Sequence, residues 1–368
     1  MTATAATSAA PAVARPSPST TVDVLVIGAG QAGLAVGHLL RSVAIRFELV
    51  EQNRRIGDSW RQRYDSLSLF TPRSYSHLPG LLLDGDPEGY PTRDEMAAYL
   101  ERYASHFDIP IRLSTTVVGL ERFGTGFIAS LDDESTIEAR AVVVASGAFQ
   151  VPAVPAIASG LSPDVKQLTP LSYRNPSSVP AGVVLVVGDG ATGRQVAEEL
   201  ATSHRAVLAT GKERSLAPQR ILGRSIFWWL DHLGLLRLSS DSRLGRRLHA
   251  RDTIPRRDLR DQKLREAGVE LVPRLSGLTG STATFEDGQS REVTAVVWAT
   301  GYRDNTSWMH IGEAVDSSGR FIESRGLSPV PNLFFVGRPW QTSQGSALVT
   351  GVGADAQAIA TRSIAMLG

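Results

Sequence analysis

Apolar runs that stop at glycine or at a charged residue mark the strands of this chain. Residues 24–27 (VLVI) form such a run before Gly28, and residues 47–50 (FELV) form another before Glu51. A short continuous apolar run is typical of a parallel strand that is covered on both faces. The stretch from Gln31 to about Arg41 lies between them and is predicted to be helical. This order of strand, helix and strand predicts an α/β fold.

The next part of the chain alternates between helical and strand patterns. Residues 91–107 are predicted to form a helix that begins with a capping box of Thr92 and Glu95. Residues 111–140 contain shorter strands separated by turn residues, which predicts a small antiparallel excursion. Residues 141–145 are predicted to form a further buried strand. The apolar face of the helix is expected to lie in the core and consists of Met96, Tyr99, Leu100 and Tyr103.

The opening pattern then repeats. Residues 183–187 (VVLVV) run into a second glycine turn, a helix follows to about Ser203, and residues 206–209 form the next strand. Strands at 293–299 and 333–337, with a terminal helix after them, are expected to return to the first domain. Internal duplication of this kind indicates two units of common design.

We therefore predict two Rossmann-like dinucleotide-binding domains, the second inserted into the first. The first domain comprises residues 22–150 and 291–368 and includes the antiparallel excursion. The second domain comprises residues 151–290. Residues 1–21 are rich in Ala, Ser, Thr and Pro, which predicts a disordered tail.

Composition narrows the function. The 368 residues carry a formal net charge of +1, which gives no reason to expect a nucleic-acid partner. There is no cysteine, so an internal disulfide and a dithiol redox pair are excluded. No run approaches the roughly 18 apolar residues of a membrane-spanning helix, and residues 1–21 lack the apolar segment of a secretory signal. We expect a cytoplasmic protein.

Gly28, Gly30 and Gly33 form the pattern G-x-G-x-x-G between the first strand and the first helix. The first glycine makes the tight turn, the second lets a pyrophosphate approach the backbone, and the third lets helix and strand pack closely. The helix that starts at Gln31 directs free N–H groups and its positive dipole end toward the phosphates. Glu51 follows about 20 residues later, where an acid accepts the hydrogen bonds of an adenosine ribose.

The same glycine pattern occurs at residues 188–193, but the ribose end differs. The second strand of this unit is followed by Thr210, Lys212 and Arg214. A 2′-phosphate needs a cation and is excluded by a carboxylate at the strand end. These residues favour NADP over NAD, with Glu213 toward the ribose of NAD as the alternative.

Two stretches of the sequence, residues 57–65 and 221–238, allow more than one interpretation. Residues 57–65, which include Trp60, follow the first ribose-binding strand and are interpreted as wrapping over a cofactor, with core packing as the alternative. Residues 221–238 are the most apolar stretch outside the strands and centre on Phe227, Trp228 and Trp229. A substrate channel, a membrane surface, a partner interface and plain core remain alternatives for this stretch.

In these motifs the chain resembles the class B flavin-dependent monooxygenases, particularly the short YUCCA-like branch of bacteria and plants. The matching segments are the two glycine motifs, GDSW at 57–60, RYD at 63–65, ATGY at 299–302 and FVG at 335–337. The resemblance covers nearly all of the chain after Thr21. It implies FAD in the first domain and NADPH in the second, with a small molecule and molecular oxygen as substrates. A homodimer is left open.

The motifs and the resemblance together predict the site residues. Gln344, Ser343 and Tyr302 are the candidate catalytic residues, and no metal site is predicted. The terminal helix is expected to direct its N-terminus at the pyrimidine edge of the flavin. The residues predicted to bind the two cofactors are Gly28, Gly30, Gln31, Ala32, Gly33, Glu51, Gln52, Asp58, Ser59, Trp60, Arg63, Leu69, Val117, Val118, Ala145, Ser146, Gly147, Gly188, Gly190, Ala191, Thr192, Gly193, Thr210, Lys212, Arg214, Thr300, Gly301, Gly337 and Leu348.

The resemblance implies a monooxygenase that inserts one atom of O2 into a small, mostly apolar substrate at nitrogen, sulfur or a carbonyl, through a C4a-(hydro)peroxyflavin. One motif departs from the family pattern F-x-G-x-x-x-H-x-x-x-Y/W. In residues 163–173 Tyr173 fits, but Thr169 replaces the histidine, and the Phe and Gly are missing. The motif is associated with NADPH binding and domain coupling. An NAD(P)H oxidase or reductase, passing electrons to oxygen, a quinone or a partner, is therefore the alternative. A third hypothesis is a flavoprotein that presents a binding surface without turnover.

Overall fold

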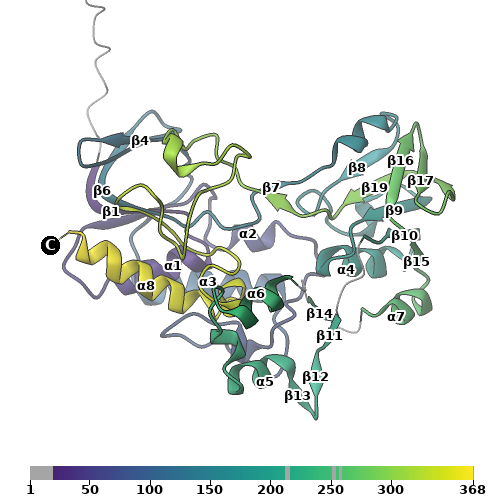
Figure 1. Ribbon diagram of the computed structural model, residues 1–368, viewed down its shortest axis with the longest axis horizontal. Helices are drawn as coiled ribbons and strands as arrows, with labels where there is room; N and C mark the ends of the chain where they lie inside the picture. Colours follow the sequence, from purple (N-terminus) through teal and green to yellow (C-terminus); the bar gives the residue numbers. More distant parts are fainter. Residues whose placement is uncertain (1–19, 212–215, 251–253, 257–258, 368) are drawn as a thin grey trace, which may run out of the picture.

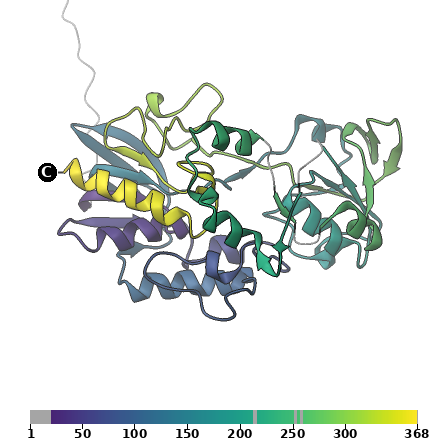
Figure 2. The same ribbon diagram turned by 60° about the horizontal axis from the view of Figure 1, so that its bottom comes forward.

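The computed structural model describes residues 20–211, 216–250, 254–256 and 259–367. Figure 1 shows two lobes, each built on a sheet, and Figure 2 shows the terminal helix lying along the first lobe. The fold is mixed α/β with two Rossmann-like domains, which confirms the predicted class. Of the predicted tail, Thr20 and Thr21 lie in the first strand instead, and the other residues lie outside the described part.

The first domain is built on a seven-stranded sheet in the order β3-β2-β1-β6-β5-β4, with β21 paired to β6. The pairs among β3, β2, β1, β6 and β21 are parallel, and those among β6, β5 and β4 are antiparallel. The strands are β1 Thr20–Ile27, β2 Phe47–Val50, β3 Ile111–Arg112, β4 Val117–Phe123, β5 Gly126–Leu131, β6 Thr136–Val144 and β21 Leu333–Phe335. β6 is one strand across the predicted break at residue 140, because its first half pairs with β5 and its second half with β21.

Helices cover one face of this sheet. They are α1 Gln31–Leu40, α3 Arg93–His106 and α8 Val352–Ala365. Val24 and Val26 of β1 pack in the core under these helices, whereas Leu25 and Ile27 point to a second core on the other face. Burial on both faces explains the continuous apolar run. The predicted capping box of α3 is present, and the four residues of its predicted apolar face are buried.

The second domain has a five-stranded parallel sheet in the order β15-β10-β9-β19-β8. Its strands are β8 Lys166–Leu168, β9 Val183–Val187, β10 Arg205–Ala209, β15 Glu270–Val272 and β19 Ala295–Trp298, and its helices include α4 Ala191–Leu200 and α7 Asp261–Glu266. A small antiparallel sheet adds β16 Leu275–Thr279, β17 Thr282–Phe285 and β18 Ser290–Glu292. The expectation that residues 293–299 return to the first domain is wrong, because β19 pairs with β9 and β8. The chain returns after Trp298 rather than near residue 291.

Two short strands carry the chain between the lobes. β7 Val151–Pro152 leaves the first domain, β20 Tyr302–Arg303 returns to it, and the two pair in antiparallel fashion. The backbone N–H of Ala153 also donates to the carbonyl of Gly301 at 2.9 Å. The remaining α-helices and strands of the described residues are α2 Asp58–Arg61, β11 Leu216–Pro218, β12 Arg220–Ile221, β13 Arg224–Ser225, α5 Ile226–His232, α6 Arg243–Ala250 and β14 Ile254–Arg256.

Candidate functional site

The first glycine turn joins β1 to α1 in the geometry that a nucleotide cradle requires. Gly28 has a φ of +102°, and a Cβ on Gly33 would lie 1.9 Å from the carbonyl oxygen of Gly28. A Cβ on Gly30 would meet no described protein atom within 4 Å, so this side of the turn is open. Gly30 is the N-cap of α1 and makes no side-chain cap hydrogen bond. The first-turn N–H groups at Gln31 and Ala32 therefore remain available to an anion.

Glu51 lies beside this turn, at the carboxyl end of β2. Its carboxylate is buried, and its Oε2 accepts a hydrogen bond from the N–H of Ala29 at 2.9 Å. Its Oε1 accepts two hydrogen bonds from Asn53, one from the backbone N–H at 3.0 Å and one from the side-chain amide at 2.6 Å. A carboxylate has about four acceptor positions, so about one position, on Oε2, remains for a ribose hydroxyl. Of the neighbouring candidates, Val117 is buried in the core whereas Val118 is exposed.

Two further strand ends meet the first turn. A Cβ on Gly337, just after β21, would lie 2.7 Å from the Cβ of Ala32 in α1. Ala145, at the end of β6, lies under Gly28, whose added Cβ would be 2.7 Å from the Ala145 carbonyl. Ser146 and Gly147 follow, and both accept hydrogen bonds from the side chain of Gln150. The structure thus brings these candidates together at the carboxyl edge of the sheet, where open α/β sheets bind ligands.

The second glycine turn repeats this geometry between β9 and α4. Gly188 has a φ of +104°, and a Cβ on Gly193 would lie 1.8 Å from the Gly188 carbonyl oxygen. A Cβ on Gly190 would again meet nothing within 4 Å in the described part of the chain. Ala191 and Thr192 form the first turn of α4, which is uncapped by any described side chain. The predicted duplication is therefore present in three dimensions.

The ribose end of the second unit is described only in part. The Thr210 hydroxyl lies after β10 and donates to the Val272 carbonyl at 3.0 Å. Lys212 and Arg214, on which the choice of NADP depends, lie outside the described residues. The preference for NADP over NAD stays a prediction.

Arg194, which no sequence motif singles out, holds the second turn in place. Its guanidinium is buried and donates to the carbonyls of Asp189 at 3.1 Å and Leu259 at 2.7 Å. It also pairs with Asp261 at 2.8 Å. Arg194 directly follows the glycine motif, and only the packing shows that its side chain points into the domain.

The candidate catalytic residues lie on two different elements. Ser343 and Gln344 begin a short 3-10 helix, Gln344–Ala347, and the Ser343 hydroxyl caps it. The buried Oε1 of Gln344 has no hydrogen-bond donor among the described residues, so it is available to a donor on a bound molecule. Tyr302 lies instead on the linker strand β20, where its hydroxyl accepts a hydrogen bond from Arg63 at 2.7 Å. Thr300 of the same linker donates to the Ala153 carbonyl at 2.6 Å.

A buried acid lies next to this 3-10 helix. Asp355, in the first turns of α8, is 1% exposed and accepts a hydrogen bond from the Thr342 hydroxyl. Burial raises the pKa of this carboxyl group above its usual value. Its other oxygen, Oδ2, has no donor among the described residues. No sequence motif singles out Asp355, because its burial depends on the packing of α8 against a distant part of the chain.

The apolar stretch at 221–238 packs on the first domain. Phe227 of α5, Leu236 and Leu348 form one buried cluster, against which Phe70 and Tyr75 pack. For Phe227 the core interpretation is therefore confirmed, and Leu348 is part of the same core. Burial, together with Asp231, raises the pKa of Tyr75 to about 12.

The substituted histidine motif lies at the carboxyl end of β8. The Thr169 N–H donates to the Ser172 hydroxyl at 2.9 Å and so forms a local turn. Tyr173 is fully buried and donates to Glu199 of α4 at 2.9 Å. Tyr173 thus keeps a structural role, while no imidazole is present at position 169.

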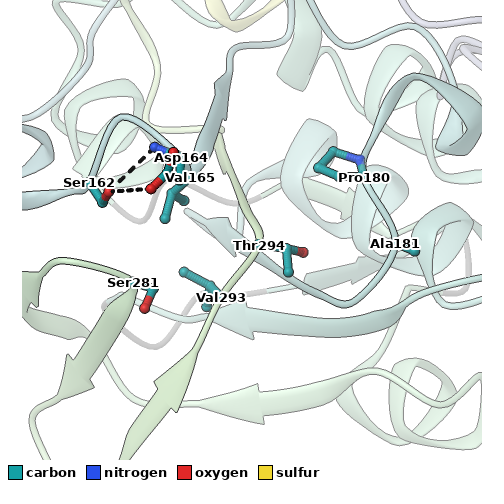
Figure 3. A pocket seen from close by; sticks show the side chains of 8 residues that line it. All are labelled: Ser162, Asp164, Val165, Pro180, Ala181, Ser281, Val293 and Thr294. Atoms are coloured by element: carbon teal, nitrogen blue, oxygen red, sulfur yellow. Dashed lines mark hydrogen bonds between the residues drawn. The ribbon is translucent and has the colours of Figure 1, made fainter.

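The structure also contains a pocket that lies away from the two glycine turns. A pocket of about 380 Å3 includes Ser162, Asp164 and Thr294 in its lining and is shown in Figure 3. It lies at the amino ends of β8, β9 and β19, away from the carboxyl edge that carries the glycines. The described ranges contain no group of three His, Asp or Glu side chains able to hold a metal ion. In the same ranges no helix is long and apolar enough to cross a membrane.

Comparison with known proteins places these features in context. A family model described as pyridine nucleotide-disulphide oxidoreductase matches residues 25–221. The uncharacterized CzcO-like oxidoreductase of Geobacillus kaustophilus is 44% identical over 91% of this chain and 96% of its own length. A probable indole-3-pyruvate monooxygenase of the YUCCA type from Arabidopsis thaliana is 29% identical over 84% of this chain and 81% of its own. The structure of a flavin-containing monooxygenase from Stenotrophomonas maltophilia superposes with a TM-score of 0.78 at 26% identity, covering 94% of this chain and 99% of that one.

Proposed function

The chain belongs to the pyridine nucleotide-disulphide oxidoreductase family as a CzcO-like oxidoreductase, and from that premise we propose that it is an FAD- and NADPH-dependent monooxygenase. Its substrate is a small, mostly apolar molecule that is oxygenated at nitrogen, sulfur or a carbonyl. Family membership implies a flavin-dependent oxidoreductase that binds FAD and NAD(P)H. The choice of NADPH and the oxygenation of a substrate are the proposal.

The absence of cysteine carries this proposal. Other flavoproteins with this architecture pass electrons to a disulfide, but a chain without cysteine has no internal thiol to accept them. Electrons that leave the flavin must therefore go to oxygen or to an external acceptor. The similarity to a flavin-containing monooxygenase over 94% of the chain supports oxygen as the electron acceptor.

The residues present fit the two cofactors. FAD is assigned to the first turn, because the Glu51 carboxylate lies beside that turn at the end of β2, and an added Cβ on Gly30 would meet no described atom within 4 Å. NADPH is assigned to the second turn, where Gly190 is equally open. A bound flavin supplies the redox chemistry, accepting hydride from the nicotinamide and reacting with oxygen once reduced.

The protein's own contribution is binding, orientation and exclusion of water. The N–H groups at the starts of α1 and α4 bind the two pyrophosphates. The Oε1 of Gln344, which has no hydrogen-bond donor within the described part of the chain, accepts a hydrogen bond from the flavin or the substrate. The cluster of Phe227, Leu236 and Leu348 lies next to the 3-10 helix that begins at Gln344, since Leu236 lies beside Gly345. It keeps that side of the site dry.

Thr169 favours a second candidate function. Position 169 has no imidazole, and the family motif there is associated with NADPH binding and domain coupling. An NAD(P)H oxidase or reductase that releases hydrogen peroxide or reduces a quinone is therefore the alternative.

Coupling stoichiometry distinguishes the two functions. The purified protein should be yellow and should bleach when NADPH is added without oxygen. On return to air with a panel of amines, sulfides and ketones, a monooxygenase forms about one oxygenated product per NADPH consumed. NADPH consumption that yields only hydrogen peroxide with every substrate would favour the oxidase, and failure of both nicotinamides to bleach the protein would refute both candidates.

A further inference from the structure

The loop after α2 belongs to the first domain by sequence but contacts both domains. Its root is fixed in the first domain, where Arg61 pairs with Asp58 at 3.0 Å and with Glu101 of α3 at 2.7 Å. Gly57 has a φ of +83°, and an added Cβ would lie 2.6 Å from the Ala97 carbonyl. The loop therefore starts from a rigid position.

Tyr64 extends from this loop into the second domain. It is 2% exposed and belongs to the hydrophobic core under the second sheet, with its ring 6.3 Å from that of Tyr173. Its hydroxyl donates a hydrogen bond to the side chain of Gln195 in α4. Gln195 lies two residues after Gly193, on the helix that begins at the second glycine turn.

The loop backbone strengthens the same connection. The N–H of Asp65 donates to the Arg174 carbonyl at 2.7 Å, and the Arg174 guanidinium donates to the Arg63 carbonyl at 3.0 Å. The Asn175 side chain donates to the Asp65 carboxylate at 2.6 Å. These contacts join the loop to the segment that follows β8 in the second domain.

Arg63, the neighbour of Tyr64, contacts both linkers. Its guanidinium lies 5.5 Å from the ring centres of both Phe149 and Tyr302 and donates to the Tyr302 hydroxyl at 2.7 Å. Phe149 comes just before β7, and Tyr302 opens β20. Arg63 thus contacts both segments that connect the domains, while the adjacent Tyr64 contacts α4 of the second domain.

We propose that Arg63 and Tyr64 are positioning residues that hold the second domain at the angle from which a nicotinamide at the second glycine turn reaches the flavin of the first. This inference rests on the proposed function. The linkers pair over only two residues each, so they form a natural hinge between the lobes. Hydride transfer requires close approach, and a displacement of about 1 Å can lower a rate by about 100-fold.

The test combines Arg63→Met with Tyr64→Phe, because these substitutions keep the apolar packing and remove the polar contacts. Gln62→Ala is the matched control, since Gln62 is exposed in the same loop and bonds only to Asn53 of the first domain among the described residues. Thermal unfolding and FAD content verify that each variant is folded and loaded. We expect flavin reduction at saturating NADPH to slow by at least about tenfold in the double variant, with a change in the NADPH dissociation constant of less than about threefold.

A second measurement does not depend on activity. The chain has no native cysteine, so spin labels at Ser105→Cys in α3 and Thr279→Cys in β16, both exposed, report the distance between the domains. The double variant should broaden the distance distribution, and the control should leave it unchanged. An unaltered distribution overturns the inference, as does a broadened one with an unaltered reduction rate. If NADPH fails to reduce even the wild-type flavin, the proposed function fails instead, and the distances still decide whether the two residues hold the domains.

Discussion

Alanine substitutions at Gly30 and Gly190 should show which glycine turn binds FAD and which binds NADP⁺. Each glycine is the N-cap of its helix, with φ and ψ of −73° and −171° at Gly30 and −68° and −179° at Gly190. Alanine adopts such extended angles without strain. An added Cβ at either position meets no described protein atom within 4 Å. Gly30→Ala and Gly190→Ala should therefore still fold, with a loss of about 1 kcal/mol because alanine is a poorer N-cap than glycine.

The ligand, however, should meet the new methyl group. A pyrophosphate oxygen bound to the N–H groups of the first turn lies about 2.9 Å from the nitrogen, on the side where the Cβ would point. Loss of one charge-assisted hydrogen bond costs roughly 1.5–3 kcal/mol, which corresponds to roughly 10- to 150-fold in the dissociation constant. Gly30→Ala should weaken FAD binding by this factor and leave NADP⁺ binding intact, and Gly190→Ala should do the reverse.

Titration of the deflavinated protein with FAD, and of the FAD-loaded protein with NADP⁺, measures both constants. Gly312→Ala is the control, because it is an exposed glycine of the first domain that also has no described atom within 4 Å of an added Cβ. Gly193→Ala provides a contrast, since its Cβ would overlap the Gly188 carbonyl at 1.8 Å and should destabilise the fold itself. The assignment of the two turns would be refuted if Gly30→Ala and Gly190→Ala both kept wild-type affinities, or if Gly190→Ala alone lost FAD.

Three further predictions concern stability. Asp355→Asn should stabilise the protein more at pH 8 than at pH 4. Folding raises the pKa of this carboxyl group, so its contribution to the free energy of unfolding is lost as the pH rises through the raised pKa. Equal shifts in melting temperature at both pH values would contradict this. Tyr173→Phe should cost about 1–3 kcal/mol in urea unfolding, because Glu199 loses a buried donor, and an unchanged urea midpoint would speak against it. Arg338→Ala should cost about 3 kcal/mol, because Asp304, whose side chain is 6% exposed, loses its two-pronged partner at 2.6 and 2.9 Å; Arg338→Lys should recover only part of the loss, and full recovery would argue against the two-pronged geometry.

Features that depend on neighbouring residues in the chain were predictable from the sequence. The glycine turns, the capped helix at 93–106 and the strand before Glu51 all lie where the pattern places them. Each is set by conformational limits or hydrogen bonds within a few residues, so spacing alone identifies it. The predicted roles of these residues toward FAD and NADPH stay predictions.

Features that depend on the partner of a strand or side chain were not predictable. The apolar run of β19 resembles the strands of either sheet, and only its pairing with β9 and β8 assigns it to the second domain. The burial of Arg194 and of Asp355 likewise depends on elements far away in the chain.

The sequence by itself determined that the chain contains two glycine turns of the same design. Because it contains no cysteine, it also determined that no internal thiol accepts electrons from a bound flavin. Only the tertiary structure decided how the cradles are joined. The contacts of Arg63 with Tyr302 and of Tyr64 with Gln195 span 239 and 131 residues of chain. No periodicity encodes such contacts, because they join side chains from distant parts of the chain.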